Sequence, residues 1–149
     1  MNINFTKMHG LGNDFILIDC IKEDCRFIPA QFPPDQGGEM GGDRLDFADL
    51  AKKLCHRRFG IGADQLLLLH TSKIADFKMR IFNADGSEAG MCGNGIRCLA
   101  KYIWDRSLSD KKIIAIETPS GIIRPEKAGE MVRVDMGEPV LEPEGIPVN

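Results

Sequence analysis

The sequence lacks a strong excess of charge, a long apolar run and a leader-like start. Its 149 residues hold 19 Lys and Arg against 22 Asp and Glu, so we expect no broad basic surface for nucleic acid. The apolar run at residues 66–69 is far shorter than a membrane span of about 20 residues. The opening letters, MNINFTKMHG, lack the basic-then-apolar order of a signal peptide. We therefore expect a globular chain in the cytoplasm, without membrane or nucleic-acid partners.

Cysteine pairs of the C-x-x-C type are absent as well. The five cysteines are Cys20, Cys25, Cys55, Cys92 and Cys98. An odd number without an export signal argues against a disulfide framework, so we expect reduced thiols. A metal site is disfavoured because the usual ligand spacing is missing; its candidate ligands are Cys20, Cys25, Cys55 and His56. Cys55 instead falls on the apolar face of a helical pattern and is expected in the core.

Signatures of nucleotide binding are also missing. No G-x-x-x-x-G-K-[ST] loop occurs in the sequence. Residues 93–98, GNGIRC, have cysteine where a dinucleotide fingerprint requires its last glycine, and they follow a loop, which excludes a Rossmann assignment. The three histidines have no carboxylate partner at a telling spacing, so we assign no proton-transfer role to His9, His56 or His70.

Alternating apolar and polar residues predict a β-rich α+β domain. Two strands are expected at residues 3–7 and 15–18, joined as a hairpin by the glycine-rich turn 9–13. Further strands are expected at 65–69, 77–81, 113–117 and 131–136. The segment between the fourth strand and the second helix, NADGSEAGMCGNG at 83–95, is dense in turn formers and is predicted to be a loop.

Two helices are predicted from apolar residues at helical spacing. The first begins at Asp43 or Asp46 as its N-cap and stops at Gly60. Arg57 and Arg58 suit the dipole at its C-terminal end. Its apolar stripe consists of Phe47, Leu50, Ala51, Leu54 and Cys55. The second helix buries one face, formed by Ile96, Leu99, Ala100 and Ile103.

The chain is expected to form one domain over residues 1–136, followed by a linker over 137–149. The last stretch, GEPVLEPEGIPVN, carries three prolines and no pattern of a helix or strand. Residues 32–42, FPPDQGGEMGG, combine proline, glycine and acidic residues, as is typical of a solvated loop. That loop is unusually long for a compact domain, and the sequence assigns it no role.

Cys92, Gly93 and Asn94 stand at the predicted start of the second helix. The first turn of a helix leaves N–H groups without partners and carries partial positive charge, which favours an anion and the thiolate form of a cysteine. Because Gly93 leaves the backbone open, this segment offers both a base and a cradle for a substrate carboxylate. The residues equally suit a tight turn in which Cys92 has no chemical role. Cys98 is expected to be structural.

Three segments in the same order resemble diaminopimelate epimerase: MHGLGNDF at 8–15, GIGADQ at 60–65, and residues 83–97, which begin NADGSE and end CGNGIR. The similarity extends to MGEP at 136–139. It covers nearly the whole chain but only the first half of the family's length. The resemblance implies a fold of two pseudo-symmetric halves, each a curled, mostly antiparallel sheet around a central helix, with the active site between them.

The resemblance also implies an activity: interconversion of LL- and meso-diaminopimelate, in lysine and cell-wall precursor synthesis, without pyridoxal phosphate or another cofactor and without a metal. Cys92 then matches the catalytic cysteine of the first half, which exchanges a proton with the substrate opposite a second cysteine. Substrate-contacting positions are matched by Asn13, Gln65, Asn83, Gly93 and Asn94. The second cysteine belongs to the other half, so the implied partners are diaminopimelate and a second half-domain or a second copy of this chain.

Two alternatives stay open. A proline-racemase-like or phenazine-biosynthesis-like sibling has the same fold, although the N-A-D-G-S and C-G-N-G segments fit the epimerase better. A catalytically incomplete fragment, or a module that holds a carboxylate without catalysis, would share the Cys92 segment. Residues 32–42 look like an insertion relative to the family's spacing.

Overall fold

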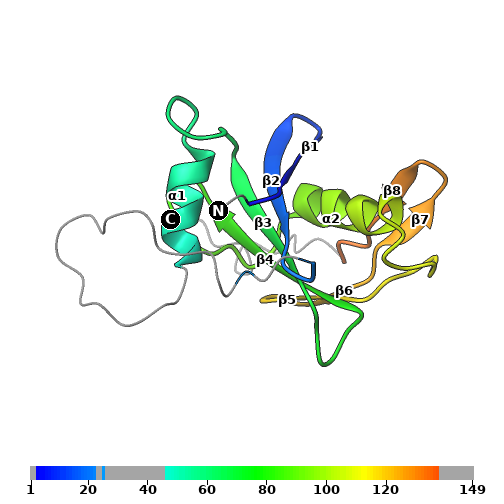
Figure 1. Ribbon diagram of the computed structural model, residues 1–149. Helices are drawn as coiled ribbons and strands as arrows, with labels where there is room; N and C mark the ends of the chain where they lie inside the picture. The colour runs from blue at the N-terminus through cyan, green and yellow to red at the C-terminus, as the bar shows by residue number, and fades with distance from the viewer. Residues whose placement is uncertain (1–2, 23–24, 26–45, 138–149) are drawn as a thin grey trace, which may run out of the picture.

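The computed structural model describes residues 3–22, 25 and 46–137. Its elements are β1 (Thr6–Gly10), β2 (Asn13–Asp19), α1 (Phe47–Cys55), β3 (Gln65–His70), β4 (Phe77–Asn83), α2 (Gly93–Asp105), β5 (Ile116–Thr118), β6 (Gly121–Ile123), β7 (Glu126–Ala128) and β8 (Met131–Arg133) (Figure 1). Asp43 and the segments 32–42 and 138–149, for which a cap, a loop and a linker are predicted, lie outside the described residues. No helix in the described ranges is long and apolar enough to cross a membrane.

The strands of the described residues form one six-stranded sheet and one hairpin. The sheet has the order β1-β2-β3-β4-β5-β6, and the hairpin joins β7 to β8. Neighbouring strands pair antiparallel except at β2–β3 and β4–β5, which are parallel. The fold is therefore α+β with a mostly antiparallel sheet, as predicted.

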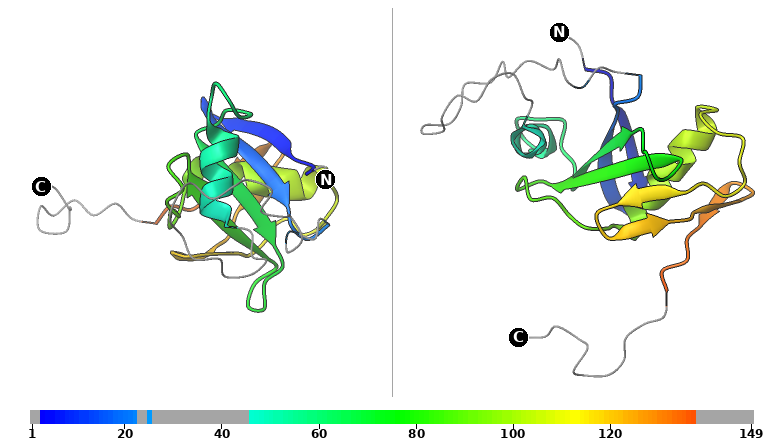
Figure 2. Two further views of the ribbon diagram at one scale, coloured as in Figure 1. Left: turned by 60° about the vertical axis from the view of Figure 1, so that its left-hand side comes forward. Right: turned by 90° about the horizontal axis from the view of Figure 1, so that it is seen from below.

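The two helices cover opposite faces of this sheet (Figure 2). Successive side chains of a strand point to opposite faces. In β2, β3 and β4, alternate residues such as Phe15, Leu67 and Ile81 therefore join α2 in one core cluster. The residues between them join α1 in a second cluster, whose members include Ile16, Leu66 and Phe82.

Helix α2 is the central helix of the fold. The sheet curls around it, so that α2 lies between the β1–β2 hairpin, strands β5 and β6, and the β7–β8 hairpin (Figure 1). The predicted apolar face is buried, and so are Cys98, Tyr102 and Trp104. More of the helix is covered than the sequence predicted because other elements also pack on it. Gly10 of β1 lies beside Cys98, Asp19 of β2 accepts a hydrogen bond from Tyr102, and the β7–β8 hairpin contributes Val132.

Helix α1 begins at the predicted cap and ends earlier than predicted. The Asp46 side chain accepts a hydrogen bond from the Ala48 N–H at 2.9 Å. The helix ends at Cys55, whose side chain is buried in the core as expected. A Cβ atom at Gly60 would lie 2.1 Å from the carbonyl oxygen of Lys53, so the turn after the helix needs glycine there. The prediction for Arg57 is wrong: it lies beyond the helix and binds Asp14 and Asp64.

The short strands near the C-terminal end of the described chain are not recognised, or only in part, from the sequence pattern. β6 and β7 were not predicted, and the strand expected at 113–117 is formed only from Ile116 to Thr118. Each of these strands has three residues, too few for alternation to be recognised. The hairpin β5–β6 turns at Gly121, whose φ of 118° favours glycine.

Cys20 and Cys25 form a disulfide bond, which corrects the expectation of reduced thiols for this pair. The chain turns after β2 and brings the two Cα atoms to 5.3 Å, within the usual range for a disulfide. Cys55, Cys92 and Cys98 are free. The pairing also removes two of the four candidate metal ligands considered above.

Leu99 of α2 is fully buried in the core cluster of that helix. We expect Leu99→Ala to lower the free energy of unfolding by about 2–5 kcal/mol, because it removes buried methyl groups and leaves a cavity. Urea titration followed by the fluorescence of Trp104, the single tryptophan, measures the change. Ile74→Ala, at a side chain 70% exposed, is the control and should change stability by less than about 0.5 kcal/mol. Equal effects would contradict the assigned core.

Asp76 holds the start of the parallel β4–β5 pair. Its carboxylate accepts hydrogen bonds from the Ala115 N–H at 2.9 Å and from Lys111 Nζ at 2.5 Å. The Ala115 bond, and then Lys111, lower the pKa of the Asp76 carboxyl. A carboxyl whose pKa is lower in the folded state stabilises the fold above its unfolded pKa, and this stabilisation is lost as pH falls through the folded pKa.

Asp76→Asn should therefore lose less stability than the wild type when the pH falls from 7 toward the acidic range, because the carboxylate that protonates is gone. Urea midpoints measured across the acidic range test this. Asp105→Asn removes a carboxylate that is 56% exposed and paired with Lys101, and it should leave the acid slope nearly unchanged. An Asp76→Asn protein with the wild-type slope would contradict the role of Asp76.

Candidate active site

Three amide side chains gather at one end of the sheet, on the face that α2 covers. Asn13 begins β2, Gln65 begins β3 and Asn83 ends β4. Gln65 lies opposite Asn83 in the antiparallel ladder and next to Phe15 in the parallel one. Because these residues stand two positions from core residues of the α2 cluster, the pleat turns their side chains toward α2. They were the amides singled out from the sequence.

Cys92 is the N-cap of α2 and faces the same end of the sheet. Its sulfur accepts a hydrogen bond from the Gly95 N–H at 3.4 Å and one from Asn13 Nδ2 at 3.7 Å. Its carbonyl oxygen accepts the Ile96 N–H at 2.8 Å. The structure thus brings Asn13 and Cys92, 79 positions apart, into contact. Two N–H donors therefore converge on the sulfur.

Glycines let the first turn of α2 pack closely on the sheet. A Cβ atom at Gly95 would lie 3.2 Å from Leu67 and 3.3 Å from Ile81, and one at Gly10 would lie 3.4 Å from Asn94. A side chain at Gly95 would have to displace Leu67 and Ile81, whereas a Cβ atom at Gly10 would lie in ordinary contact with Asn94. The close approach keeps the Cys92 sulfur beside Asn13.

Gly93 and Asn94 form the first turn of α2, where backbone N–H groups have no partner within the helix. A Cβ atom at Gly93 would lie 3.4 Å from the side chain of Met136, so glycine keeps this turn open beside that residue. The side-chain oxygen of Asn94 accepts a hydrogen bond from Arg97. This bond engages the acceptor of the Asn94 side chain, so the side-chain Nδ2 group and the backbone N–H groups are the donors at this position.

Gln65 and Asn83 bind each other. Gln65 Nε2 donates to Asn83 Oδ1 at 2.7 Å, and Asn83 Nδ2 donates to Ser87 Oγ at 2.9 Å. Within the described part of the chain, Gln65 Oε1 is buried without a hydrogen-bond partner. An unpaired buried acceptor is costly.

The remaining cysteines and histidines have structural surroundings. Burial raises the pKa of both the Cys55 and the Cys98 thiol to about 11. His56 Nδ1 accepts hydrogen bonds from the N–H groups of Arg58 and Phe59, each at 3.2 Å, and so shapes the turn after α1. Burial, followed by the charges of Arg80 and Lys78, lowers the pKa of His70. Across residues 3–22, 25 and 46–137, no group of three or more His, Cys, Asp or Glu side chains is placed to hold a metal ion.

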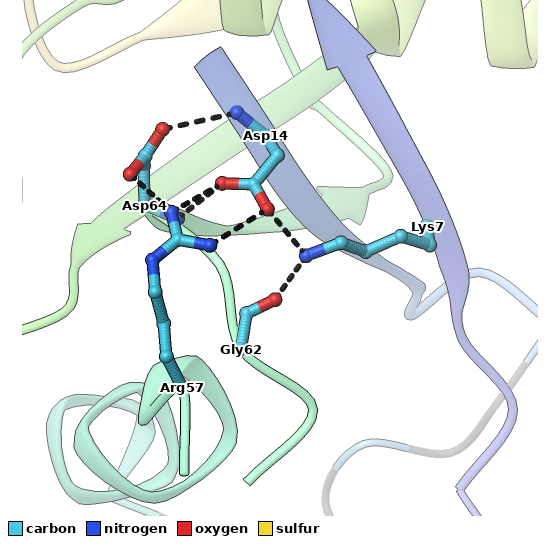
Figure 3. Close-up of polar contacts among 5 residues, drawn as sticks. All are labelled: Lys7, Asp14, Arg57, Gly62 and Asp64. Carbon is cyan, nitrogen blue, oxygen red and sulfur yellow. Dashed lines mark hydrogen bonds and ion pairs between the residues drawn. The ribbon is translucent and has the colours of Figure 1, made fainter. Parts of the chain in front are cut away.

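A cluster of charges that the sequence did not reveal lies beside this site. It consists of Lys7, Asp14, Arg57 and Asp64 and is called the Arg57 cluster below (Figure 3). Its carboxylates follow Asn13 and precede Gln65 in two of the motifs, which is the signal that the sequence offered. Their partner Arg57 comes from a third segment, and only the fold brings it there.

Comparison with known proteins identifies close relatives of this sequence. A family model described as diaminopimelate epimerase matches residues 5–142. The diaminopimelate epimerase of Carboxydothermus hydrogenoformans is 51% identical over 147 residues, which are 98% of this chain and 48% of the relative. The one from Acetivibrio thermocellus is 46% identical over 153 residues, 99% of this chain and 48% of that protein. The chain thus spans about half the length of the curated relatives it matches.

Solved structures share the fold at low sequence identity. A probable proline racemase from Agrobacterium radiobacter superposes with a TM-score of 0.59 at 16% identity, covering 89% of this chain and 41% of that one. A hydroxyproline epimerase from Agrobacterium vitis gives a TM-score of 0.55 at 14% identity, over 85% and 38%. At this identity the likeness establishes the architecture alone.

The free cysteines should differ in reactivity. We expect iodoacetamide to modify Cys92 at least about tenfold faster than Cys55 or Cys98 in the folded chain, because those two thiols are buried and carry raised pKa values. Peptide mass spectrometry over a time course measures the three rates. In denaturant the three should react alike. Labelling of Cys98 as fast as Cys92 in the native protein would contradict the packing of α2.

Proposed function

Because the chain belongs to the diaminopimelate epimerase family, we propose that it supplies one of the two acid–base groups of a cofactor-free amino-acid epimerase acting on diaminopimelate. The proposal rests above all on Cys92, which caps α2 with its sulfur beside the Asn13 amide. The relatives are about twice as long as this chain. This difference in length supports the proposal that the second acid–base group comes from a second half-domain.

In the proposed reaction the Cys92 thiolate removes the proton from the substrate α-carbon. The S–H bond forms as the C–H bond breaks, and the electron pair stays on the carbon and spreads into the substrate carboxylate. A thiol on the opposite face then delivers a proton to that carbon, which inverts the configuration. The two sulfurs have exchanged their protonation states, and the reverse reaction follows the same steps.

Charge develops on the substrate carboxylate during this step, and the N-terminus of α2 suits it. The N–H groups of Gly93 and Asn94 bind the carboxylate, and the helix dipole offsets its charge. A preorganised site of this kind stabilises the carbanion without a cofactor. Cys92, at the same terminus, is then placed beside the α-carbon.

Neutral amides hold the rest of the substrate. Asn13, Gln65 and Asn83 offer donors and acceptors without adding a charge that competes with the reaction. The buried, unpartnered Gln65 Oε1 accepts an N–H from the substrate ammonium group. Asn13 also contacts the sulfur directly, so it links substrate binding to the base.

The proposed domain organisation follows from the relatives' length. Residues 1–136 form the first half-domain, and residues 137–149 connect it to a second half that completes the site. The enzyme would serve lysine and cell-wall precursor synthesis in the cytoplasm. A second copy of this chain is the alternative partner, since self-complementary pairing is the commonest symmetric assembly and each copy would donate Cys92.

The catalytic assignment predicts that Cys92→Ala abolishes exchange of the substrate α-proton. The test protein joins this chain to the second half of the Carboxydothermus hydrogenoformans relative, and mass spectrometry follows deuterium incorporation from D2O into LL-diaminopimelate under reducing conditions. We expect Cys92→Ala to lower the rate at least about 100-fold, the usual effect of losing an acid–base group. Cys55→Ala, which removes a buried thiol on the opposite face of the sheet, should retain most of the activity.

The outcomes separate the proposal from its alternatives. A Cys92→Ala fusion that still exchanges the α-proton would exclude Cys92 as the base. Binding of diaminopimelate without exchange by the wild-type fusion would favour a carboxylate-binding module. The 149-residue chain assayed alone decides between the partners: exchange by an isolated dimer would favour a second copy over a second half-domain.

A further inference from the structure

Asp14 and Asp64 hold the starts of β2 and β3 together by reciprocal backbone bonds. The Asp14 N–H donates to Asp64 Oδ2 at 3.1 Å, and the Asp64 N–H donates to Asp14 Oδ1 at 2.9 Å. The Asp64 N–H also lies 3.0 Å from the main-chain oxygen of Asp14. β2 and β3 run parallel, and a parallel pair has no tight turn to set its register. The two carboxylates therefore fix the register at this end.

Arg57 is the cation that allows two carboxylates to lie this close. Its Nη2 atom lies 2.9 Å from Asp14 Oδ1 and 2.7 Å from Asp64 Oδ1, and its Nη1 atom lies 3.2 Å from Asp14 Oδ2 (Figure 3). The bond to Arg57 is the main cause that lowers the pKa of the Asp14 carboxyl. A planar guanidinium presents its donors in a rigid fork that engages both oxygens of Asp14 and one oxygen of Asp64 at once, whereas an ammonium group donates from a single atom and lacks this fork.

Lys7 is the fourth member of the Arg57 cluster, and it also contacts the loop at Gly62. Lys7 Nζ lies 2.8 Å from Asp14 Oδ2 and also donates to the carbonyl oxygen of Gly62. Gly62 has a φ of 81°, and a Cβ atom there would lie 3.2 Å from Arg57 Cα, so glycine lets the loop fold back over Arg57. The cluster thus joins β1, β2, the loop after α1 and the start of β3, with two positive and two negative charges.

The Arg57 cluster and the candidate active site lie on opposite faces of the sheet, and residues that are adjacent in the chain contribute to the two of them. Asp14 follows Asn13, and Asp64 precedes Gln65. Adjacent residues of a strand point to opposite faces. The carboxylates therefore point to the side of α1 and Arg57, while the two amides point to the side of α2 and Cys92.

We propose that Arg57, Asp14 and Asp64 are positioning residues that set where the Asn13 and Gln65 side chains lie relative to Cys92. The role of these amides in substrate binding rests on the proposed function. Their positions relative to Cys92 are independent of it. The cluster contacts neither Cys92 nor its sulfur, so it acts through the backbone of two strand starts. Arg57 is 60% exposed and Asp64 44%, and exposed ion pairs add little stability. The effect of removing Arg57 should therefore be found at Asn13 more than in the melting temperature.

The test uses the 149-residue chain without substrate. Nuclear magnetic resonance follows the Asn13 side-chain amide before and after iodoacetamide modifies Cys92, with the labelled site verified by peptide mass spectrometry. In the wild type, modification should shift the Asn13 amide resonances, because Nδ2 lies 3.7 Å from the sulfur. In Arg57→Gln most of this response should be lost, with a melting temperature close to that of the control variant.

Lys78→Gln is the matched control. Lys78 pairs with Glu117 at 2.8 Å across the other parallel strand pair, β4–β5, and both are Cα partners there. This variant also removes one cation from a parallel pair, but away from the amides, so it should keep the wild-type Asn13 response. A general loosening of the sheet would move both variants alike.

A wild-type Asn13 response in Arg57→Gln would overturn the proposal, and so would an equal loss in Lys78→Gln. If Arg57→Gln does not fold, Arg57→Lys decides: its ammonium group keeps the charge but lacks the planar fork that engages both carboxylates, so a partial loss is expected, and a full wild-type response would contradict the proposal. Failure of the proposed function is a separate result. Exchange that survives Cys92→Ala would remove the catalytic role of Cys92 and leave the Asn13 response unaffected.

Discussion

The position of helix α2 depends on which side chains of β2, β3 and β4 point toward it. Every second residue of these strands packs against α2. In β4 the charged Lys78 and Arg80 stand between those residues, so burial of the apolar face fixes which way that strand is turned. The same alternation continues to the strand ends, where Asn13, Gln65 and Asn83 stand in place of apolar residues. A slip of one residue would turn the amides away from Cys92, and in β4 it would turn Lys78 and Arg80 into the core around α2. The core and the candidate site therefore depend on one register.

Local patterns were enough to predict the elements that carry many apolar residues. The cap at Asp46, the burial of Cys55 and the central strands follow from periodicity and capping chemistry, and the structure confirms them. The three-residue strands β6 and β7 could not be predicted because three residues are too few for an alternating pattern to be recognised. The disulfide between Cys20 and Cys25 was missed because it depends on how the chain turns after β2.

The sequence predicted which residues belong to the candidate site, but it did not predict how they are arranged in space. A cysteine at a helix start is a local signal, and the amides were identified through the resemblance to a family. The contact of Asn13 with Cys92, the packing of Gly10 against Asn94 and the bonds of Arg57 join segments distant in sequence. Arg57 is the clearest case that the sequence alone could not predict. Its position near the end of a predicted helix suggested a role at the helix dipole, whereas its partners are two carboxylates at the starts of β2 and β3.

β2 and β3 pair in parallel, so the contacts between their first residues do not depend on the full length of the chain that connects them. The chain leaves the sheet after Asp19 and returns at Gln65, and α1 and Arg57 lie within this connection. Residues gained or lost between Cys25 and Asp46 do not change which of these side chains meet. Closing a longer loop costs little, about 0.6 kcal/mol for each doubling of its length. The length of that part can therefore vary, while folding must bring together two strands that are distant in sequence.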